Sequence, residues 1–319
     1  MIVVNFNIAK SVRGCMVGAM ALLSGVGAVA APPVQSADCG RIERMSLYSP
    51  QMGDTITIDT WLPPMYYAGG SERYPVIYMH DGQNLYDAAT TWNHQSWEMD
   101  SVMCALLTTG EIDPAIIVGI HSSAETRVAD LMPEKAVSGS RALAETLEQV
   151  KLHGMTPRGD AYAAFMVETL KPVVDERYRT ESDMRHTTVM GSSMGGLMSI
   201  YALCEYPAVF GNALCLSTHW IGAPSVSEEF TRAMYDYLEQ TLPVAEPIDS
   251  EHGHRLYFDH GTETIDAWYG PSEERILELV RGKGYGEGTL LNIVDEGAAH
   301  EERSWARRVS IPLRYLLSR

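Results

Sequence analysis

Residues 186–206, HTTVMGSSMGGLMSIYALCEY, hold the clearest fold signal in the chain. A short apolar run typical of a strand leads into a cluster of small residues, and apolar residues then recur at helical spacing until Pro207. Within it, residues 191–195 (GSSMG) are the only match to G-x-S-x-G. This pattern is typical of a strained strand-to-helix turn that lifts a serine hydroxyl above a sheet, with glycines where a Cβ would collide. Ser193 is therefore the candidate nucleophile.

Strand and helix patterns alternate along most of the chain. Residues 41–48 and 55–62 alternate in polarity and predict an antiparallel pair. Further strands are predicted at 74–80, 115–120, 187–190, 212–218, 255–259 and 289–294, and helices at 96–109, 160–176, 229–240, 272–281 and 301–318, the last interrupted near Pro312. This order predicts an α/β fold with a mostly parallel sheet, helices on both faces and an antiparallel N-terminal pair. Residues 122–159 have little periodicity and indicate a long excursion over the strand ends.

Composition excludes several classes of partner. The chain has 319 residues, 45% of them apolar, and a formal net charge of −17. It can therefore bury a large core, and its surface repels phosphate backbones and anionic lipid headgroups. We expect a small-molecule partner, with no nucleic acid and no membrane surface bound through charge.

The N-terminus resembles a leader. Residues 1–30 contain two basic side chains, then an uncharged run that ends in Ala-Val-Ala, the pattern of a signal peptidase site. We expect a signal peptide at 1–30, a spacer at 31–40 and one folded domain at 41–319, exported to the periplasm or the extracellular space. An uncleaved anchor is the alternative, although 17 Gly- and Ala-rich residues are short for a membrane span.

Four cysteines remain after such cleavage. They are Cys39, Cys104, Cys204 and Cys215, without C-x-x-C spacing, so no metal site is predicted, and nothing indicates an organic cofactor. An oxidising compartment would allow one disulfide. Cys204 and Cys215 lie in apolar runs and are expected in the core.

A serine nucleophile needs a base and an acid that orients the base. In this type of fold both follow the serine, on loops that leave sheet strands. His300 follows the last predicted strand and is assigned as the base. The acid should follow the strand at 255–259, where Asp266 and Glu263 both qualify and Asp266 is favoured.

The oxyanion of acyl transfer needs backbone donors. One should come from Met194, which follows the nucleophile, and one from the loop after the strand at 74–80, with Gly82 favoured over Gln83. Three further residues are candidates for the walls of a substrate pocket: Trp97, His219 and Trp220. Ordinary packing in the core would explain these side chains equally well.

Several motifs together resemble a known family. HDGQNLYD, GSSMGG, STHW, YFDHGTETIDAWY and EGAAHEERSW, in this order, are similar to the putative esterase family, the esterase D and enterochelin-esterase-like branch of the α/β-hydrolase superfamily. The resemblance covers residues 41–319 and implies an α/β-hydrolase fold and a serine carboxylesterase with its triad at the positions above. Asp266 matches the acidic position of the GT…LDA..Y pattern, whereas other branches place the acid where this chain has Thr264.

The resemblance does not select a substrate. The family includes feruloyl and acetyl esterases, formylglutathione hydrolases, siderophore trilactone hydrolases and mycolyl transferases. Formylglutathione is a cytosolic substrate, so export argues against formylglutathione hydrolysis. The negative net charge of the protein gives no long-range attraction for an anionic ferric siderophore. We therefore expect an ester of a carbohydrate or small alcohol. The alternatives are siderophore ester hydrolysis, acyl transfer to a sugar or lipid, and a catalytically silent binding domain.

Overall fold

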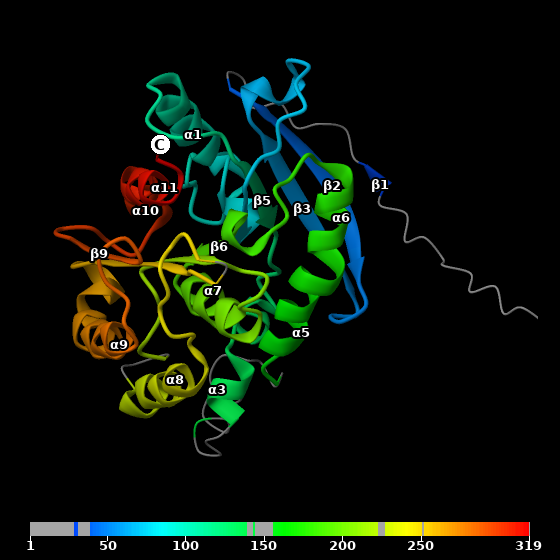
Figure 1. Cartoon of the computed structure of the whole chain (residues 1–319). Coiled ribbons are helices and arrows are strands. Elements are labelled where there is room, and N and C mark those ends of the chain that lie inside the picture. Colours follow the sequence, from blue (N-terminus) through cyan, green and yellow to red (C-terminus); the bar gives the residue numbers. More distant parts are fainter. Residues whose placement is uncertain are drawn as a thin grey trace, which may run out of the picture.

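The computed structural model describes residues 29–30, 39–138, 143, 156–222, 227–250 and 252–318. Most of the predicted leader and spacer, and residues 139–142 and 144–155 of the predicted excursion, lie outside these ranges. Figure 1 shows one sheet running through the described part of the chain, with helices on either side. Within these ranges no helix is long and apolar enough to cross a membrane.

Among the described residues, the sheet has nine strands in the order β1-β2-β3-β5-β4-β6-β7-β8-β9. The strands are β1 (Val29–Ala30), β2 (Arg41–Ser49), β3 (Asp54–Leu62), β4 (Val76–His80), β5 (Ile116–Ile120), β6 (Thr187–Ser192), β7 (Asn212–Leu216), β8 (Arg255–Gly261) and β9 (Leu290–Asp295). From β5 to β9 neighbouring strands are parallel, whereas β1, β2 and β3 join by antiparallel pairing. The predicted mostly parallel sheet and its antiparallel N-terminal pair are confirmed.

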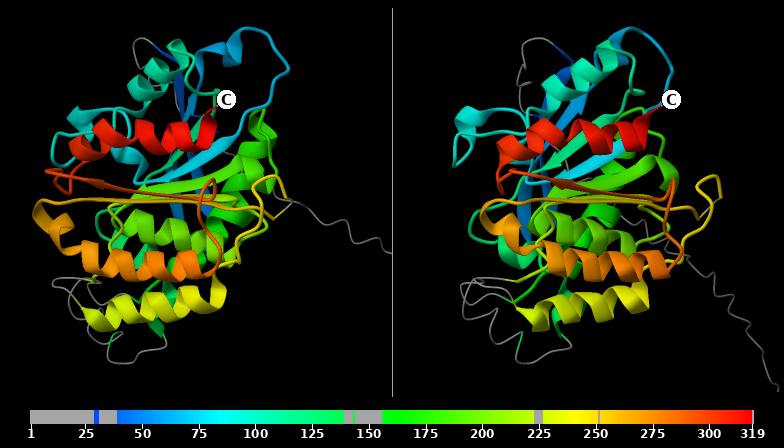
Figure 2. Two further views of the ribbon diagram at one scale, coloured as in Figure 1. Left: turned by 60° about the vertical axis from the view of Figure 1, so that its left-hand side comes forward. Right: turned by 90° about the vertical axis from the view of Figure 1, so that its left-hand side faces the viewer.

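Two helical layers cover the sheet. One face carries α1 (Met99–Thr108), α10 (Glu302–Arg308) and α11 (Ser310–Leu317). The other carries α3 (Glu134–Ser138), α5 (Gly159–Ala164), α6 (Lys171–Arg177), α7 (Met194–Glu205), α8 (Glu228–Thr241) and α9 (Gly270–Gly282). Figure 2 shows the two layers on opposite sides of the strands.

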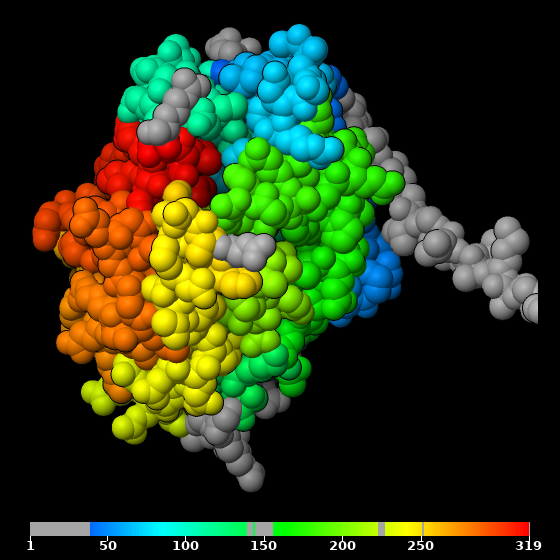
Figure 3. Space-filling view, viewed as in Figure 1, coloured from blue at the N-terminus to red at the C-terminus, as the bar shows by residue number. Residues whose placement is uncertain are grey.

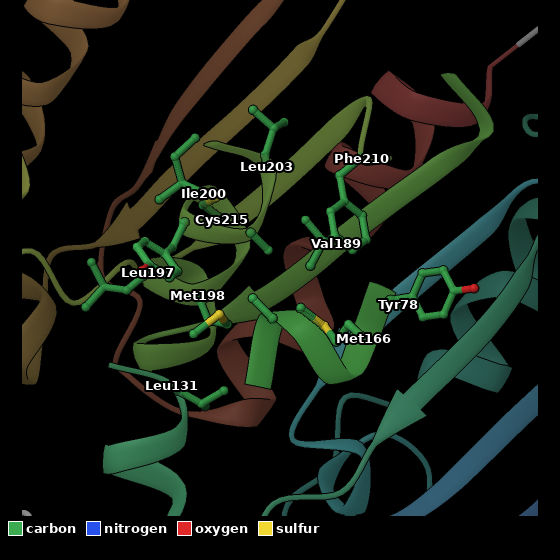
Figure 4. Packing of buried hydrophobic residues seen from close by; sticks show 14 of the residues in the cluster. Tyr78, Leu131, Met166, Val189, Leu197, Met198, Ile200, Leu203, Phe210 and Cys215 are labelled. Atoms are coloured by element: carbon green, nitrogen blue, oxygen red, sulfur yellow. The ribbon is translucent and has the colours of Figure 1, made fainter. Parts of the chain in front are cut away.

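The apolar strands feed both layers because side chains alternate along a strand. In β6, Val189 joins the core under α7, while Met190 joins the core under α1 and α10. Figure 4 shows the first of these cores, in which α7 lies against β6 and β7. The parallel strands β4 to β8 are almost wholly buried, which explains their mostly apolar sequences, whereas the edge strand β9 is only half-buried.

Two predicted helices differ from expectation in detail. The C-terminal helical stretch breaks at Val309, between α10 and α11, and not at Pro312. Pro312 lies in the first turn of α11, where a missing N–H leaves no intrahelical bond unmade. The predicted helix at 160–176 is also interrupted, because residues Phe165–Leu170 form a π-helical segment between α5 and α6. Pro172, at the start of α6, cannot donate to the preceding turn.

The strand order reverses beside β4, which has β5 on one side and β6 on the other. Loops after β4 and β6 therefore leave the same edge of the sheet and turn to opposite faces. In open parallel sheets, such a switch point opens a crevice at the carboxyl ends of the strands. Ser193 follows β6 directly, and Asp81 follows β4.

Candidate active site

Ser193 occupies the turn between β6 and α7. Its backbone has φ 57° and ψ −121°, a region that non-glycine residues rarely adopt and that costs about 1–3 kcal/mol. A Cβ on Gly191 would lie 2.8 Å from Gly195, and one on Gly195 would lie 3.1 Å from the Cβ of His80. The glycines therefore let the turn close tightly over the end of β4, as the sequence pattern indicates.

His300 and Asp266 meet although 34 residues separate them. His300 Nδ1 lies 2.5 Å from Asp266 Oδ1. An ionised carboxylate only accepts hydrogen bonds, so Nδ1 carries the proton and Nε2 has a free lone pair. This is the tautomer that a general base requires.

The second carboxylate oxygen of Asp266 accepts two hydrogen bonds. Asp266 Oδ2 accepts hydrogen bonds from Ser217 Oγ at 2.6 Å and from the backbone N–H of Gly261 at 2.7 Å. Burial alone would raise the pKa of this carboxyl, but the His300 contact and these hydrogen bonds outweigh burial and lower the pKa. Asp266 therefore stays ionised and ready to orient the imidazole.

Ser217 is itself fixed by buried partners. Its Oγ accepts hydrogen bonds from Trp305 Nε1 at 3.0 Å and from Arg308 at 2.7 Å, so its own proton goes to Asp266. Arg308 also pairs with Asp259 at 2.8 Å. This network, unforeseen in the sequence apart from the STHW motif that contains Ser217, joins α10 to the ends of β7 and β8.

The alternative acid points elsewhere. Glu263 is exposed, and its backbone N–H donates to Ala298. Thr264, at φ 56°, accepts a hydrogen bond from the His300 backbone at 2.9 Å. Thr264 thus supports the His300 loop, and Asp266 is the carboxylate that contacts the imidazole.

A cavity of about 190 Å³ joins the candidate residues. Ser193 and His300 both line it, with Met194 and His219. Its remaining lining comes from α2 (Arg127–Asp130) and the residues just after it, from the loop before α8, from α8 itself and from the 3₁₀ helix that carries Asp266: Arg127, Val128, Met132, Gly222, Phe230 and Ile265. The nucleophile and the imidazole therefore face one space of a size for a small acyl group.

A larger cavity of about 970 Å³ lies at the opposite ends of the strands. It is lined at the amino ends of the strands, for example by Pro75, Thr188, Asn212 and Arg255. The segments that form it meet on the face shown in Figure 3. None of the candidate catalytic residues lines it, so the smaller cavity is the candidate site.

Arg127 brings a cation to the candidate site. It comes from α2 (Arg127–Asp130), and its guanidinium makes two hydrogen bonds of 2.7 Å to Asp81. Ser122 donates a further hydrogen bond of 2.5 Å to the same carboxylate. The charge of Arg127 is thereby balanced and its position fixed. The sequence placed this segment near the site but did not identify Arg127.

The predicted oxyanion donors lie at helix starts. Met194 is the first residue of α7, and Gln83 is the second of a 3₁₀ turn, Gly82–Asn84. First-turn N–H groups have no intrahelical acceptor and are free to bind an anion. Gly82 also has a packing requirement, because a Cβ there would lie 2.5 Å from the backbone of Gly119 in β5. The oxyanion roles of Met194, Gly82 and Gln83 stay predictions.

Two of the three predicted pocket walls are placed elsewhere. Trp97 is 2% exposed and stacks on Trp305 at 5.4 Å between ring centroids. Trp220 is fully buried against Phe258. Both are core residues, and neither lines the cavity. His219 does line the cavity.

Within the described ranges, no three His, Cys, Asp or Glu side chains cluster as a metal site would require. The four cysteines fall into one disulfide and two free thiols. Cys39 and Cys104 form a disulfide, whereas Cys204 and Cys215 are free and buried, as their apolar surroundings predicted.

Comparison with known proteins identifies the family. The model of the family described as "Putative esterase" matches residues 49–267, more than two thirds of the chain. The chain belongs to the putative esterase family. The match includes Ser193 and Asp266, and His300 lies beyond it. Membership makes the chain an esterase, a hydrolase of carboxylic esters.

Proteins similar to this esterase have names that refer to different substrates. An endo-1,4-β-xylanase/feruloyl esterase from Xylanibacter ruminicola is 26% identical over 175 residues, which are 54% of this chain and 21% of that protein. A ferulic acid esterase superposes with a TM-score of 0.62 and 16% identity, over 86% of this chain and 97% of the other. The enterobactin esterase FES from Shigella flexneri gives 0.61 and 15%, over 88% and 60%. The structural likenesses show a shared fold.

Proposed function

We propose that this esterase is a serine hydrolase that works through an acyl-enzyme, with Ser193, His300 and Asp266 as its triad. The observation that carries the proposal is the 2.5 Å contact of Asp266 with His300. Ser193 and His300 line the same cavity, and Ser193 stands on a strained turn. Three elements distant in sequence thus supply a nucleophile, a base and an orienting acid.

The proposed reaction has two halves. The Ser193 oxygen attacks the ester carbonyl while its proton passes to His300 Nε2, and backbone N–H groups of Met194 and of Gly82 or Gln83 hold the oxyanion. His300 then returns the proton to the departing alcohol. Water repeats the sequence on the acyl-enzyme and releases the acid. Asp266 stabilises the imidazolium in both halves.

Replacement of the nucleophile tests this mechanism. Ser193→Ala should abolish hydrolysis of p-nitrophenyl acetate and labelling by a fluorophosphonate probe, while its circular dichroism and melting temperature stay close to those of the wild type. Turnover by folded Ser193→Ala at the wild-type rate would reject the mechanism. A wild-type protein that neither turns over esters nor labels would instead favour the catalytically silent alternative.

For the substrate we propose an ester of a carbohydrate. Ile265 lines the cavity, and Trp268 follows it in the 3₁₀ helix Thr264–Trp268. Such a helix has three residues per turn, so these two side chains lie on one side of it. Trp268 is 51% exposed, and an exposed indole face suits the C–H face of a pyranose ring. An anionic siderophore fits less well with a net charge of −17.

Trp268→Ala measures this contact. It should lower kcat/KM for acetylated oligosaccharides about 3- to 10-fold, the equivalent of one aromatic contact, with little change on p-nitrophenyl acetate. Tyr48→Ala, which removes another exposed aromatic ring from β2, is the matched control. Equal losses on both substrates, or none on the oligosaccharide, would contradict the carbohydrate proposal.

We also propose export with cleavage after Ala30. The Cys39–Cys104 disulfide supports this, because such bonds persist mainly in oxidising compartments. Cleavage would remove β1, which pairs through Val29 and Ala30 with Ser46 and Met45 of β2. N-terminal sequencing of the protein from the periplasm or medium should begin at Ala31, and an intact N-terminus in the cytosol would contradict export.

A further inference from the structure

Tyr269 brings a buried hydroxyl to the candidate nucleophile. It directly follows the 3₁₀ helix that carries Asp266, and its side chain is fully buried. Its ring stands edge-on to that of His300, with 5.7 Å between centroids and 81° between planes. Its hydroxyl lies 2.9 Å from His219 Nδ1. The Ser193 side chain is near enough to this hydroxyl to influence the pKa of Tyr269.

Burial keeps this phenol protonated. Burial and the nearby negative charge of Asp266 raise the pKa of Tyr269 well above its usual value, although the Ser193 hydroxyl and Arg127 oppose the rise. The hydroxyl is therefore a neutral donor throughout the pH range in which an esterase works. One O–H can donate in only one direction at a time, toward His219 or toward Ser193.

His219 is attached to Ser193 by two routes. Its backbone N–H donates to the Ser193 carbonyl at 3.2 Å, and its imidazole contacts the hydroxyl of Tyr269. His219 is 5% exposed and lines the same cavity as Ser193 and His300. If Nδ1 carries the proton, His219 donates to the phenol oxygen, and the phenol proton is then directed toward Ser193.

We propose that Tyr269 is an additional catalytic residue that donates a hydrogen bond to the Ser193 oxygen, and that His219 positions its hydroxyl. The inference rests on the proposed serine mechanism. In acylation the Ser193 proton moves to His300 Nε2 as the oxygen–carbon bond forms, and the Tyr269 proton stays on the phenol. In deacylation the carbon–oxygen bond breaks and His300 returns a proton to Ser193. In both steps the phenol stabilises partial negative charge on the same oxygen.

Tyr269→Phe removes the hydroxyl and keeps the ring. We expect kcat for p-nitrophenyl acetate to fall about 10- to 100-fold, as for a lost hydrogen bond to a charged oxygen, with KM within about twofold. Tyr285→Phe is the matched control, because Tyr285 is also a buried tyrosine of the hydrophobic core and does not line the cavity. It should retain wild-type kcat. Unchanged kcat in folded Tyr269→Phe would overturn the proposal.

Variants of His219 test the positioning role without altering Tyr269. His219→Asn keeps a polar atom near Nδ1 and should retain most of kcat, whereas His219→Leu should lose kcat as Tyr269→Phe does. The Tyr269→Phe/His219→Leu double variant should be no slower than Tyr269→Phe alone, since both changes remove one hydrogen bond. Losses that multiply, or His219→Asn as slow as His219→Leu, would contradict the positioning role.

The Ser193→Ala variant separates this proposal from the mechanism on which it rests. If Ser193→Ala is inactive and Tyr269→Phe is fully active, only the role of Tyr269 fails. If folded Ser193→Ala keeps wild-type turnover, the serine mechanism fails and the role of Tyr269 fails with it. Thermal melting of each variant establishes that it is folded before its kinetics are compared.

Discussion

At the scale of single residues, the two carboxylates near the site differ in burial and in contact. Asp266 is fully buried and bonded to His300, Ser217 and Gly261, whereas the side chain of Glu263 is exposed. Only a carboxylate that holds the imidazole can fix its tautomer and stabilise its charge. The difference in sequence position is three residues, but the chemical consequence is large.

We therefore expect unequal effects from two conservative changes. Asp266→Asn should lower kcat on the order of 10³-fold or more, because the amide stabilises the wrong imidazole tautomer. Glu263→Gln should change kcat by less than about twofold, as surface substitutions usually do. Ester hydrolysis under saturating substrate measures both. A larger loss in Glu263→Gln than in Asp266→Asn would move the acid to Glu263.

At the scale of elements, His80 joins three of them. It ends β4, packs against Gly191 and Gly195 at the turn from β6 to α7, and its Nδ1 lies 2.9 Å from the Tyr162 hydroxyl in α5. The pKa of His80 is lowered to about 4, because burial outweighs the opposing charge of Asp81, and Arg127 adds to the lowering. A proton on this imidazole would place an unpaired charge between the strand ends.

The pKa of His80 predicts a pH dependence of folding. An unfolded histidine titrates near 6.5, so between pH 6.5 and about 4 the unfolded chain binds more protons than the folded chain. The contribution of His80 to stability is therefore complete above pH 6.5 and is lost as the pH falls toward 4. The pKa difference corresponds to about 3 kcal/mol.

His80→Asn isolates this contribution, since asparagine does not titrate and keeps a polar atom near the position of Nδ1. Its free energy of unfolding should fall about 3 kcal/mol less than that of the wild type between pH 7 and pH 4. His252→Asn, at an exposed position, should follow the wild type. Urea denaturation at both pH values measures the difference, and parallel losses in all three proteins would contradict the argument.

At the scale of the whole molecule, one disulfide joins the segment before β2 to α1, a helix of the layer that also contains α10 and α11. This bond, between Cys39 and Cys104, spans 65 residues of sequence. Trp61 Nε1 donates to the Cys39 carbonyl at 3.0 Å, so β3 adjoins the same point. The bond therefore ties the antiparallel edge of the sheet to its helical cover.

Removal of this bond should destabilise the fold. Cys39→Ser/Cys104→Ser should lower the free energy of unfolding by about 2–4 kcal/mol, because a loop of this length gains freedom mainly in the unfolded chain. Dithiothreitol should lower the stability of the wild type by a similar amount and leave the double variant unchanged, since Cys204 and Cys215 are free in both. An unchanged midpoint in the reduced wild type would contradict this.

The sequence by itself determined the order of strands and helices, the mostly parallel sheet and the turn at Ser193, because these follow from local periodicity and from glycines with steric tasks. It also narrowed the histidine and the acid to a few positions. Only the tertiary structure brought Asp266 rather than Glu263 to His300, buried Trp97 and Trp220 in the core, and gathered Ser217, Arg127 and Tyr269 around the site. Those outcomes depend on which loop ends meet at one sheet edge, and on the packing between distant segments, which no local pattern encodes.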